Sequence, residues 1–209
     1  EPPYLLADMA DDAVAVLDDL GVAAAHVVGA SMGGMIAQAI AVGHPDRVRT
    51  LTSIMSTTGA PGVGAPHPDV LPLLTRPAPA DAAAAVEASV ASARVVASPG
   101  FPFDEARVRA QAEAAAERAF HPAGVARQLV AIVASPDRTP GLRRLQVPTL
   151  VIHGDDDPLV DVSGGRATAE AVPGARLVTI PGMGHDLPPA LYDRVADLIA
   201  DLAAGGPAA

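Results

Sequence analysis

Residues 25–34 read Ala25-His26-Val27-Val28-Gly29-Ala30-Ser31-Met32-Gly33-Gly34. The apolar run over 25–28 is too short for a helix, and it predicts a strand that is buried on both faces. The residues over 32–43 are apolar almost all round, which is typical of a buried helix. Ser31 is therefore expected in a sharp turn from a strand into a helix, inside the pattern Gly-x-Ser-x-Gly.

This turn favours Ser31 as a nucleophile. A sharp strand-to-helix turn strains the backbone at its centre, and the residues two positions away must be small for the turn to close. Gly29 and Gly33 meet that requirement. The backbone N–H of Met32 would then lie at a helix N-terminus, where it can stabilise an oxyanion. The alternative is a tight turn in which Ser31 only caps the helix.

A strand predicted over 149–153 is followed by three consecutive aspartates at 155–157. A carboxylate at this strand end can orient a histidine, and we assign that role to Asp157, which directly precedes a proline. The other two aspartates are expected to be solvated. The alternatives are a purely acidic loop, or a cation site formed with Asp161, although cation-binding loops space their oxygen ligands more widely.

A further predicted strand, over 176–180, leads into a glycine-rich loop that contains His185. A histidine in such a loop can approach the ends of other strands, so we assign His185 as the general base for Ser31. The alternative is a merely polar residue in a loop that enters a helix. The remaining histidines are expected to be structural: His26, His44, His67, His121 and His153.

Strand-type and helix-type segments alternate at both ends of the chain, which predicts βαβ units, a parallel sheet and the α/β fold class. A stretch rich in Pro and Gly over 59–79 and three Ala-rich helical segments separate the two ends. Ligands of such sheets bind beyond the carboxyl ends of the strands. The predicted strands cover 25–28, 48–55, 149–153 and 176–180, and the predicted helices cover 5–20, 32–43, 81–97, 104–120, 123–134, 164–171 and 189–202.

Composition limits the classes of function. Half of the 209 residues are hydrophobic and 18% are charged, so a buried core is expected. With 24 acidic against 14 basic residues, the net charge of −10 argues against a nucleic-acid partner. The sequence has no cysteine, which excludes disulfides, thiolate metal sites and a cysteine nucleophile. No apolar run long enough for a membrane span and no leader are visible, so we expect a cytoplasmic protein.

The three sites occur in the chain order serine, aspartate, histidine, which is the order of the α/β-hydrolases. The chain resembles the serine-nucleophile branch of the α/β-hydrolase fold family. The segment over 26–38 is similar to the nucleophile turn of the bacterial esterase and lactonase-like branch, and the segment over 182–188 is similar to the aclacinomycin methylesterase-like esterases. The resemblance implies Ser31 as the nucleophile, Asp157 as the orienting acid and His185 as the base. It implies neither a cofactor nor a metal.

The resemblance also implies how the chain is organised. Residues 1–58 and 141–209 would form the hydrolase core, a parallel sheet flanked by helices, and residues 59–140 a helical cap insertion. Members of the family carry four strands before the helix that opens this chain, and the loop after the third supplies a second oxyanion N–H. We therefore expect the chain to be N-terminally incomplete by roughly 60–80 residues, with its serine-bearing strand at an uncovered edge.

These features predict a serine hydrolase that cleaves a carboxylic ester, or a related bond, of a small apolar substrate through an acyl-enzyme intermediate. The expected partner is this small molecule, with neither nucleic acid nor membrane, and the oligomeric state is left open. Two alternatives remain. One is a non-catalytic fragment or binding module that retains the motifs, and the other is a C–C bond hydrolase, perhydrolase or acyltransferase that uses the same three residues.

Overall fold

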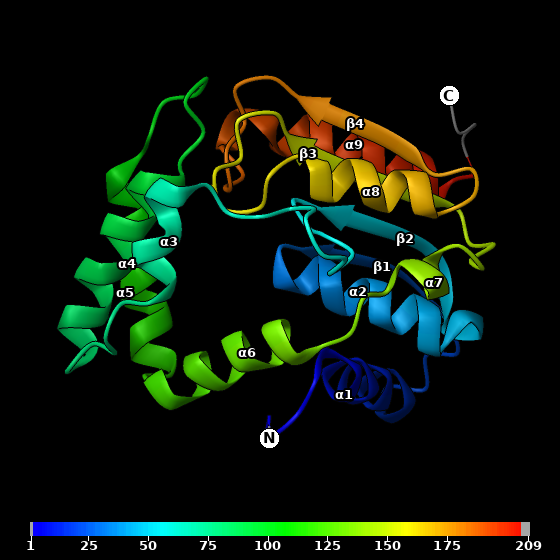
Figure 1. The fold of residues 1–209 in the computed structure, drawn as a ribbon, viewed down its shortest axis with the longest axis horizontal. Helices are drawn as coiled ribbons and strands as arrows, with labels where there is room; N and C mark the ends of the chain where they lie inside the picture. Colours follow the sequence, from blue (N-terminus) through cyan, green and yellow to red (C-terminus); the bar gives the residue numbers. More distant parts are fainter. Residues whose placement is uncertain (1, 206–209) are drawn as a thin grey trace.

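The computed structural model describes residues 2–205 and contains a four-stranded sheet (Figure 1). All three strand pairings are parallel, so the chain returns across the sheet after each strand, and it does so through helices. The predicted α/β fold class is confirmed. The strands lie side by side in the order β1 (Ala25–Ala30), β2 (Val48–Ile54), β3 (Thr149–Gly154) and β4 (Arg176–Ile180).

Helices pack against the sheet and enclose two hydrophobic clusters. Successive residues of a strand point to opposite faces, so the core forms two layers. Leu51 belongs to the layer built with helices α1 (Leu6–Asp19), α2 (Met32–Gly43) and α8 (Ser163–Ala171). The other layer contains Ile152 and is completed by α9 (Tyr192–Ala203).

The core helices lie where the sequence predicts them, within three residues at each end. The helix expected over 189–202 begins as a 3₁₀ turn, Pro189–Leu191, before α9 continues it. A second short 3₁₀ turn, Pro45–Arg47, leads from α2 into β2. Over residues 2–205, no helix combines the length and the apolar character that a membrane crossing requires. The cytoplasmic location stays a prediction.

A helical insertion lies between β2 and β3. The helices predicted over 81–97, 104–120 and 123–134 are confirmed within two residues at each end. In Figure 1, α3, α4 and α5 gather on one side, apart from the sheet, and α6 runs back toward the core. The short helix α3 falls in the stretch expected to be a loop, because a single turn that contains Pro72 has no detectable helical period. The helices are α3 (Leu71–Leu74, preceded by the 3₁₀ turn Pro68–Val70), α4 (Ala82–Val96), α5 (Glu105–Arg118), α6 (Pro122–Ala134) and α7 (Thr139–Leu142).

Strand β1 differs from its prediction. We expected a strand buried on both faces, but its residues alternate between half-buried and exposed, and Val28 is 46% exposed. Among the described residues β1 pairs with β2 alone, so it lacks the cover that β2 and β3 receive from neighbours on both sides. The strand also extends two residues further than predicted, so that Ser31 follows it directly.

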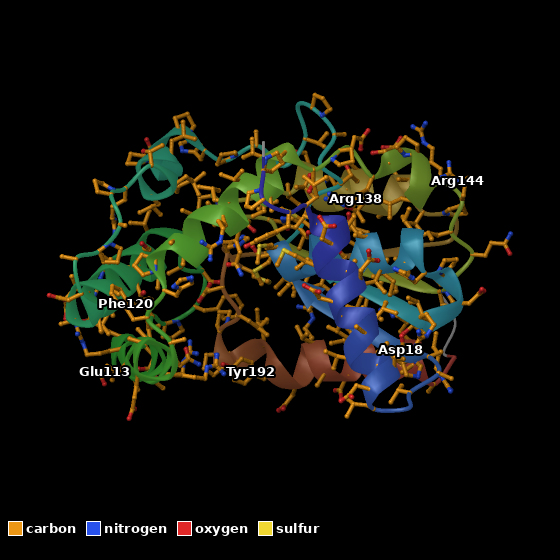
Figure 2. All side chains as sticks on the ribbon, turned by 90° about the horizontal axis from the view of Figure 1, so that it is seen from below. Asp18, Glu113, Phe120, Arg138, Arg144 and Tyr192 are labelled. Carbon is orange, nitrogen blue, oxygen red and sulfur yellow. The ribbon has the colours of Figure 1, made fainter. Side chains whose placement is uncertain are left out.

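Arg138 joins the two ends of the insertion. Its guanidinium donates to the carbonyl of Thr57 (2.8 Å), just after β2, and to Oε1 of Gln38 (3.1 Å) on α2. Its backbone N–H donates to the carbonyl of Thr58 (3.0 Å). Figure 2 shows Arg138 where the chain re-enters the core, with Phe120 at the far end of the insertion. Burial lowers the pKa of Arg138 to about 10, because the interior disfavours the charged form.

Candidate active site

Ser31 lies at the turn between β1 and α2 in a strained backbone conformation. Its φ is 54° and its ψ is −122°, a combination that costs on the order of 1–3 kcal/mol in a residue other than glycine. The Ser31 N–H donates to the carbonyl of Ile54 in β2 over 2.9 Å, which anchors the turn. Gly29 allows the turn to close, since a Cβ on Gly29 would lie only 2.0 Å from the carbonyl oxygen of Gly33.

The steric role that we expected of Gly33 belongs instead to Gly34. In the part of the chain that the structure describes, a Cβ built on Gly33 meets nothing within 4 Å. A Cβ on Gly34 would lie 2.7 Å from Cβ of Ser56, just beyond β2. Gly34 therefore lets the start of α2 approach β2, a contact that the spacing of the motif does not reveal.

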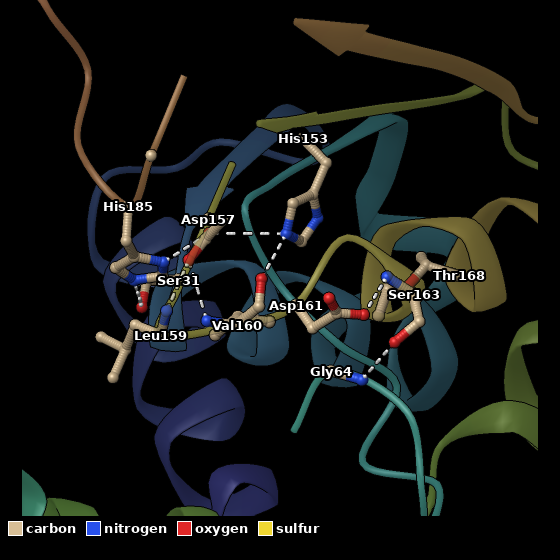
Figure 3. A network of polar contacts seen from close by, with 12 residues as sticks. Ser31, Gly64, His153, Asp157, Leu159, Val160, Asp161, Ser163, Thr168 and His185 are labelled. Carbon is tan, nitrogen blue, oxygen red and sulfur yellow. Dashed lines mark hydrogen bonds and ion pairs between the residues drawn. The ribbon is translucent and has the colours of Figure 1, made fainter. Parts of the chain in front are cut away.

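His185 reaches Ser31 from the loop that follows β4. Its Nε2 lies 2.8 Å from Oγ of Ser31 (Figure 3). The strands that precede the two residues, β1 and β4, are separated by β2 and β3, so the loop must cross intervening strand ends. Gly154 at the end of β3 makes room for this crossing, because a Cβ there would lie 2.1 Å from the carbonyl oxygen of Met183.

Asp157 holds the other side of the His185 ring. Its Oδ2 lies 2.7 Å from Nδ1 of His185, and its side chain is fully buried. Its Oδ1 accepts the backbone N–H groups of Leu159 and Val160, each over 2.9 Å. Since a carboxylate only accepts, the neutral ring carries its proton on Nδ1, and Nε2 is left to accept the Ser31 hydroxyl. Figure 3 shows this chain of contacts.

His153 also faces Asp157, a contact that we did not expect from the sequence. Its Nε2 donates to the carbonyl of Val160 over 2.8 Å and lies 3.4 Å from Oδ2 of Asp157. Burial on its own would raise the pKa of Asp157, but hydrogen bonds from His153, His185 and the Val160 N–H outweigh it and lower the pKa to about 2. The contact could have been inferred from the position of His153 near the end of the predicted strand, four residues before Asp157.

Met32 is the first residue of α2. The N–H groups in the first turn of a helix have no carbonyl in a preceding turn to bond. The Met32 N–H is therefore available at the positive end of the helix, directly beside Ser31. This is the position from which a backbone N–H can stabilise a developing oxyanion.

Comparison with known proteins identifies the family. The sequence matches the alpha/beta hydrolase fold over residues 2–188. The chain belongs to this family. It is 34% identical to the rhodomycin D methylesterase DauP of Streptomyces sp. (strain C5), covering 94% of this chain and 72% of DauP. It is 33% identical to RutD of Caulobacter sp. (strain K31), named as a candidate carbamate hydrolase, covering 88% of this chain and 66% of RutD.

A solved structure shares the architecture of this α/β hydrolase. A variant of the meta-cleavage product hydrolase CumD from Pseudomonas fluorescens IP01 superimposes with a TM-score of 0.71, at 21% identity over 95% of this chain and 71% of CumD. At that identity the likeness concerns the fold alone. The predicted membership of the α/β-hydrolase fold family is confirmed.

The neighbouring acids of this α/β hydrolase lie outside the set of three residues. Asp155 and Asp156 are exposed, as expected. Asp156 has a contact that we did not foresee, because its Oδ2 accepts the N–H of Gly182 over 2.9 Å and so ties the histidine loop to the end of β3. Asp161 accepts the N–H of Ser163 at the start of α8. Within residues 2–205, no group of three His, Asp or Glu side chains is arranged to hold a metal ion.

A large cavity separates the start of α2 from the helical insertion. It has a volume of about 690 Å³ and reaches Met32, the neighbour of Ser31. Its wall is mainly apolar, with alanines of α4, α5 and α6 alternating with larger side chains. The larger apolar residues are Leu73, Leu74, Phe120, Val125, Leu129 and Ile132, and the polar ones are Arg76, Ser89, Ser92, His121 and Gln128.

Proposed function

We propose that this α/β hydrolase is a serine esterase that works through an acyl-enzyme. The observation that carries the proposal is the continuous set of contacts from Oγ of Ser31 through His185 to Asp157, at 2.8 and 2.7 Å. The backbone strain at Ser31 supports it, because such strain persists only where surrounding structure enforces it and is concentrated at functional sites.

The geometry suits a two-step acyl transfer. Oγ of Ser31 attacks the ester carbonyl carbon while Nε2 of His185 takes the hydroxyl proton. The N–H of Met32 stabilises the oxyanion of the tetrahedral intermediate. His185 then gives the proton to the departing alkoxy oxygen, which leaves as the alcohol. A water molecule, deprotonated by His185, attacks the acyl carbon, and His185 returns this proton to Oγ of Ser31 as the bond to the acyl group breaks and the acid leaves. Asp157 keeps the imidazole in the required tautomer throughout.

The proposed substrate is a methyl ester of a bulky, largely apolar acid. The apolar cavity of about 690 Å³ beside Met32 supports a large acyl group, and the 34% identity to a rhodomycin D methylesterase supports a methyl ester. On this proposal residues 59–140 form a cap over the site, and residues 1–58 and 141–209 form the core. The partner is a small molecule, and the chemistry requires neither a metal nor a cofactor.

Active-site labelling tests the proposal. A fluorophosphonate probe should modify Ser31, as located by mass spectrometry, and the same protein should release methanol from apolar methyl esters. Ser31→Ala should abolish both reactions, while Asp155→Asn, a change at an exposed neighbour of the site, should preserve both. Modification at another serine, or ester turnover that survives Ser31→Ala, would contradict the proposal. The alternative of a non-catalytic binding module predicts neither labelling nor turnover.

Carbamate hydrolysis is a second candidate, supported by the 33% identity to RutD. The same three residues could cleave a carbamate by the same acyl transfer, with carbamoyl in place of acyl. Matched methyl esters and carbamates assayed on one preparation separate the two candidates. A kcat/KM higher for the ester supports the esterase, and the reverse order supports the carbamate hydrolase.

A further inference from the structure

The loop that carries His185 is bound to one segment of the insertion, residues 96–100, which runs from the last residue of α4 toward α5. The backbone N–H of His185 donates to the carbonyl of Val96 over 2.8 Å. At the other end of the contact, the N–H of Gly100 donates to the carbonyl of Gly182 over 2.9 Å. The insertion thus holds the backbone of His185 itself as well as its loop.

Ser98 is the centre of this contact. Its Oγ accepts the N–H of Gly184 over 2.8 Å and donates its proton to Oδ1 of Asp186. The Ser98 N–H donates to the same oxygen over 2.8 Å. Ser98 is 4% exposed. A hydroxyl has one proton to donate, and that of Ser98 goes to Asp186 while its oxygen accepts from Gly184. Through these two hydrogen bonds Ser98 binds the residues on either side of His185.

The two backbones meet without space between them. A Cβ on Gly184 would lie 2.6 Å from the carbonyl oxygens of Val96 and Ala97. A Cβ on Gly100 would lie 2.7 Å from Cα of Gly182. Packing this close transmits displacement, because neither side can yield without moving the other. A shift of residues 96–100 would therefore shift the backbone of His185.

We infer that Ser98 and Asp186 are positioning residues that make the insertion hold His185 in line with Ser31 and Asp157. The inference rests on the proposed function, in which His185 is the general base. On the core side, the start of this loop is held by Asp156, whose Oδ2 accepts the N–H of Gly182 and whose own N–H donates to the carbonyl of Met183 over 3.1 Å. Movement of the α4–α5 connection during substrate entry would therefore withdraw His185, and seating of this segment would restore the reactive geometry.

Ser98→Ala is the test, and Ser135→Ala is its matched control. Oγ of Ser135 also accepts a backbone N–H, that of Leu6 (2.9 Å), and donates to the carbonyl of Ala131 (2.6 Å). It too joins the insertion to the core, but through α1 and not through the loop that carries His185. The measurements on each variant are the melting temperature, kcat and KM for a methyl ester, and the ¹H–¹⁵N resonance of the His185 Nδ1–H in ¹⁵N-histidine-labelled protein.

The two serine variants should lose stability alike but differ at the histidine. Ser98→Ala should lower kcat roughly 10- to 100-fold, since displacing a catalytic group by about 1 Å can cost that much. Its KM should stay within about twofold, because substrate binding is not altered. The His185 resonance should shift or broaden in Ser98→Ala and stay unchanged in Ser135→Ala. Asp186→Asn keeps the accepting Oδ1 and should retain kcat, whereas Asp186→Ala should match Ser98→Ala.

One result would overturn the inference and leave the contact a merely structural one. In that result, Ser98→Ala and Asp186→Ala both have the same kcat and the same His185 resonance as Ser135→Ala. If Ser98→Ala does not fold, the comparison of Asp186→Ala with Asp186→Asn decides. If the unmodified protein folds but turns over no ester, the proposed function fails. The resonance then still decides whether Ser98 positions His185.

Discussion

Asp157 shows how burial and hydrogen bonding compete at a single residue. Its carboxylate is buried, which on its own would favour the protonated form. Oδ1 accepts two backbone N–H groups and Oδ2 faces His185, so these groups stabilise the charged carboxylate in the way that water would at the surface. Asp155 and Asp156, two residues and one residue earlier, remain exposed. The same side chain therefore has different chemistry at consecutive positions, because each faces a different environment.

Asp157→Asn should remove a pH-dependent part of the free energy of unfolding. The folded pKa of about 2 lies below the ordinary aspartate value of 3.8, so the ionised group stabilises the fold above pH 4. That contribution, about 2 kcal/mol, is lost as the pH falls from about 4 to about 2. Denaturant unfolding across this range should show the difference between wild type and Asp157→Asn shrinking with falling pH, while Asp155→Asn follows the wild type. A pH-independent difference would contradict the assigned ionisation.

Turnover gives an independent prediction at this residue. Asp157→Asn should lower kcat by roughly 10⁴, because an amide can donate to the imidazole and favours the wrong tautomer. Asp155→Asn should leave kcat within about twofold of the wild type, as expected for a surface position. Equal losses in the two variants would show that the orienting acid is not Asp157.

At the scale of elements, the turn between β1 and α2 depends on the close approach of two backbones. Gly29 at the end of β1 faces the carbonyl of Gly33 in the first turn of α2. Gly34 faces Ser56, beyond β2. Both glycines are needed because another element packs against the backbone at each of them, whereas a Cβ on Gly33 would meet nothing within 4 Å among the described residues. The strained Ser31 lies between these packed elements.

Gly29→Ala and Gly33→Ala should therefore differ sharply. Gly29→Ala should destabilise the protein by about 3 kcal/mol or more, because its Cβ would overlap a backbone atom that cannot move away. Gly33→Ala should leave stability unchanged or raise it by up to about 1 kcal/mol, since alanine is the better helix former. Thermal unfolding of both variants measures the difference. A large loss in Gly33→Ala would restore the steric role first expected of it.

Arg138 provides a second test at this scale, where the insertion leaves and rejoins the core. Arg138→Lys should destabilise the protein by about 1–3 kcal/mol, because one ammonium group cannot reproduce the two guanidinium contacts to Gln38 and Thr57. Arg144→Lys, at an exposed position, should change stability by less than about 0.5 kcal/mol. Chemical denaturation of the pair measures this, and equal midpoints would show that Arg138 does not join the two ends.

At the scale of the whole molecule, the candidate site is assembled from parts that are distant in the chain. The ends of β1, β3 and β4 supply Ser31, Asp157 and His185, and the insertion supplies most of the cavity wall. Parallel pairing places the carboxyl ends of all four strands at one edge of the sheet. The insertion follows β2 at this edge, so its helices border the site.

Filling the cavity should therefore select against large substrates. Ala116 on α5 lines the cavity, and Ala114, two residues earlier, is exposed. Ala116→Phe should lower kcat/KM for bulky apolar methyl esters roughly tenfold or more while affecting a short acyl ester much less, because only the larger group competes for the volume. Ala114→Phe should change neither. A uniform loss with both esters in Ala116→Phe would show that this wall does not bind the acyl group.

The local patterns of the sequence determined the four strands, the core helices, the helices of the insertion and the position of Ser31 in its turn. These features depend on residues close in the chain: an apolar run, a helical period, a glycine two positions from a serine. The strand ends carrying Asp157 and His185 could also be predicted, because parallel strands share an edge. The tertiary structure alone decided the role of Gly34 in place of Gly33 and the contacts of His153, Arg138 and Ser98. Each of these features depends on which distant segment packs against the residue. The packing of the whole chain decides this, and it leaves no pattern among residues that are neighbours in the sequence.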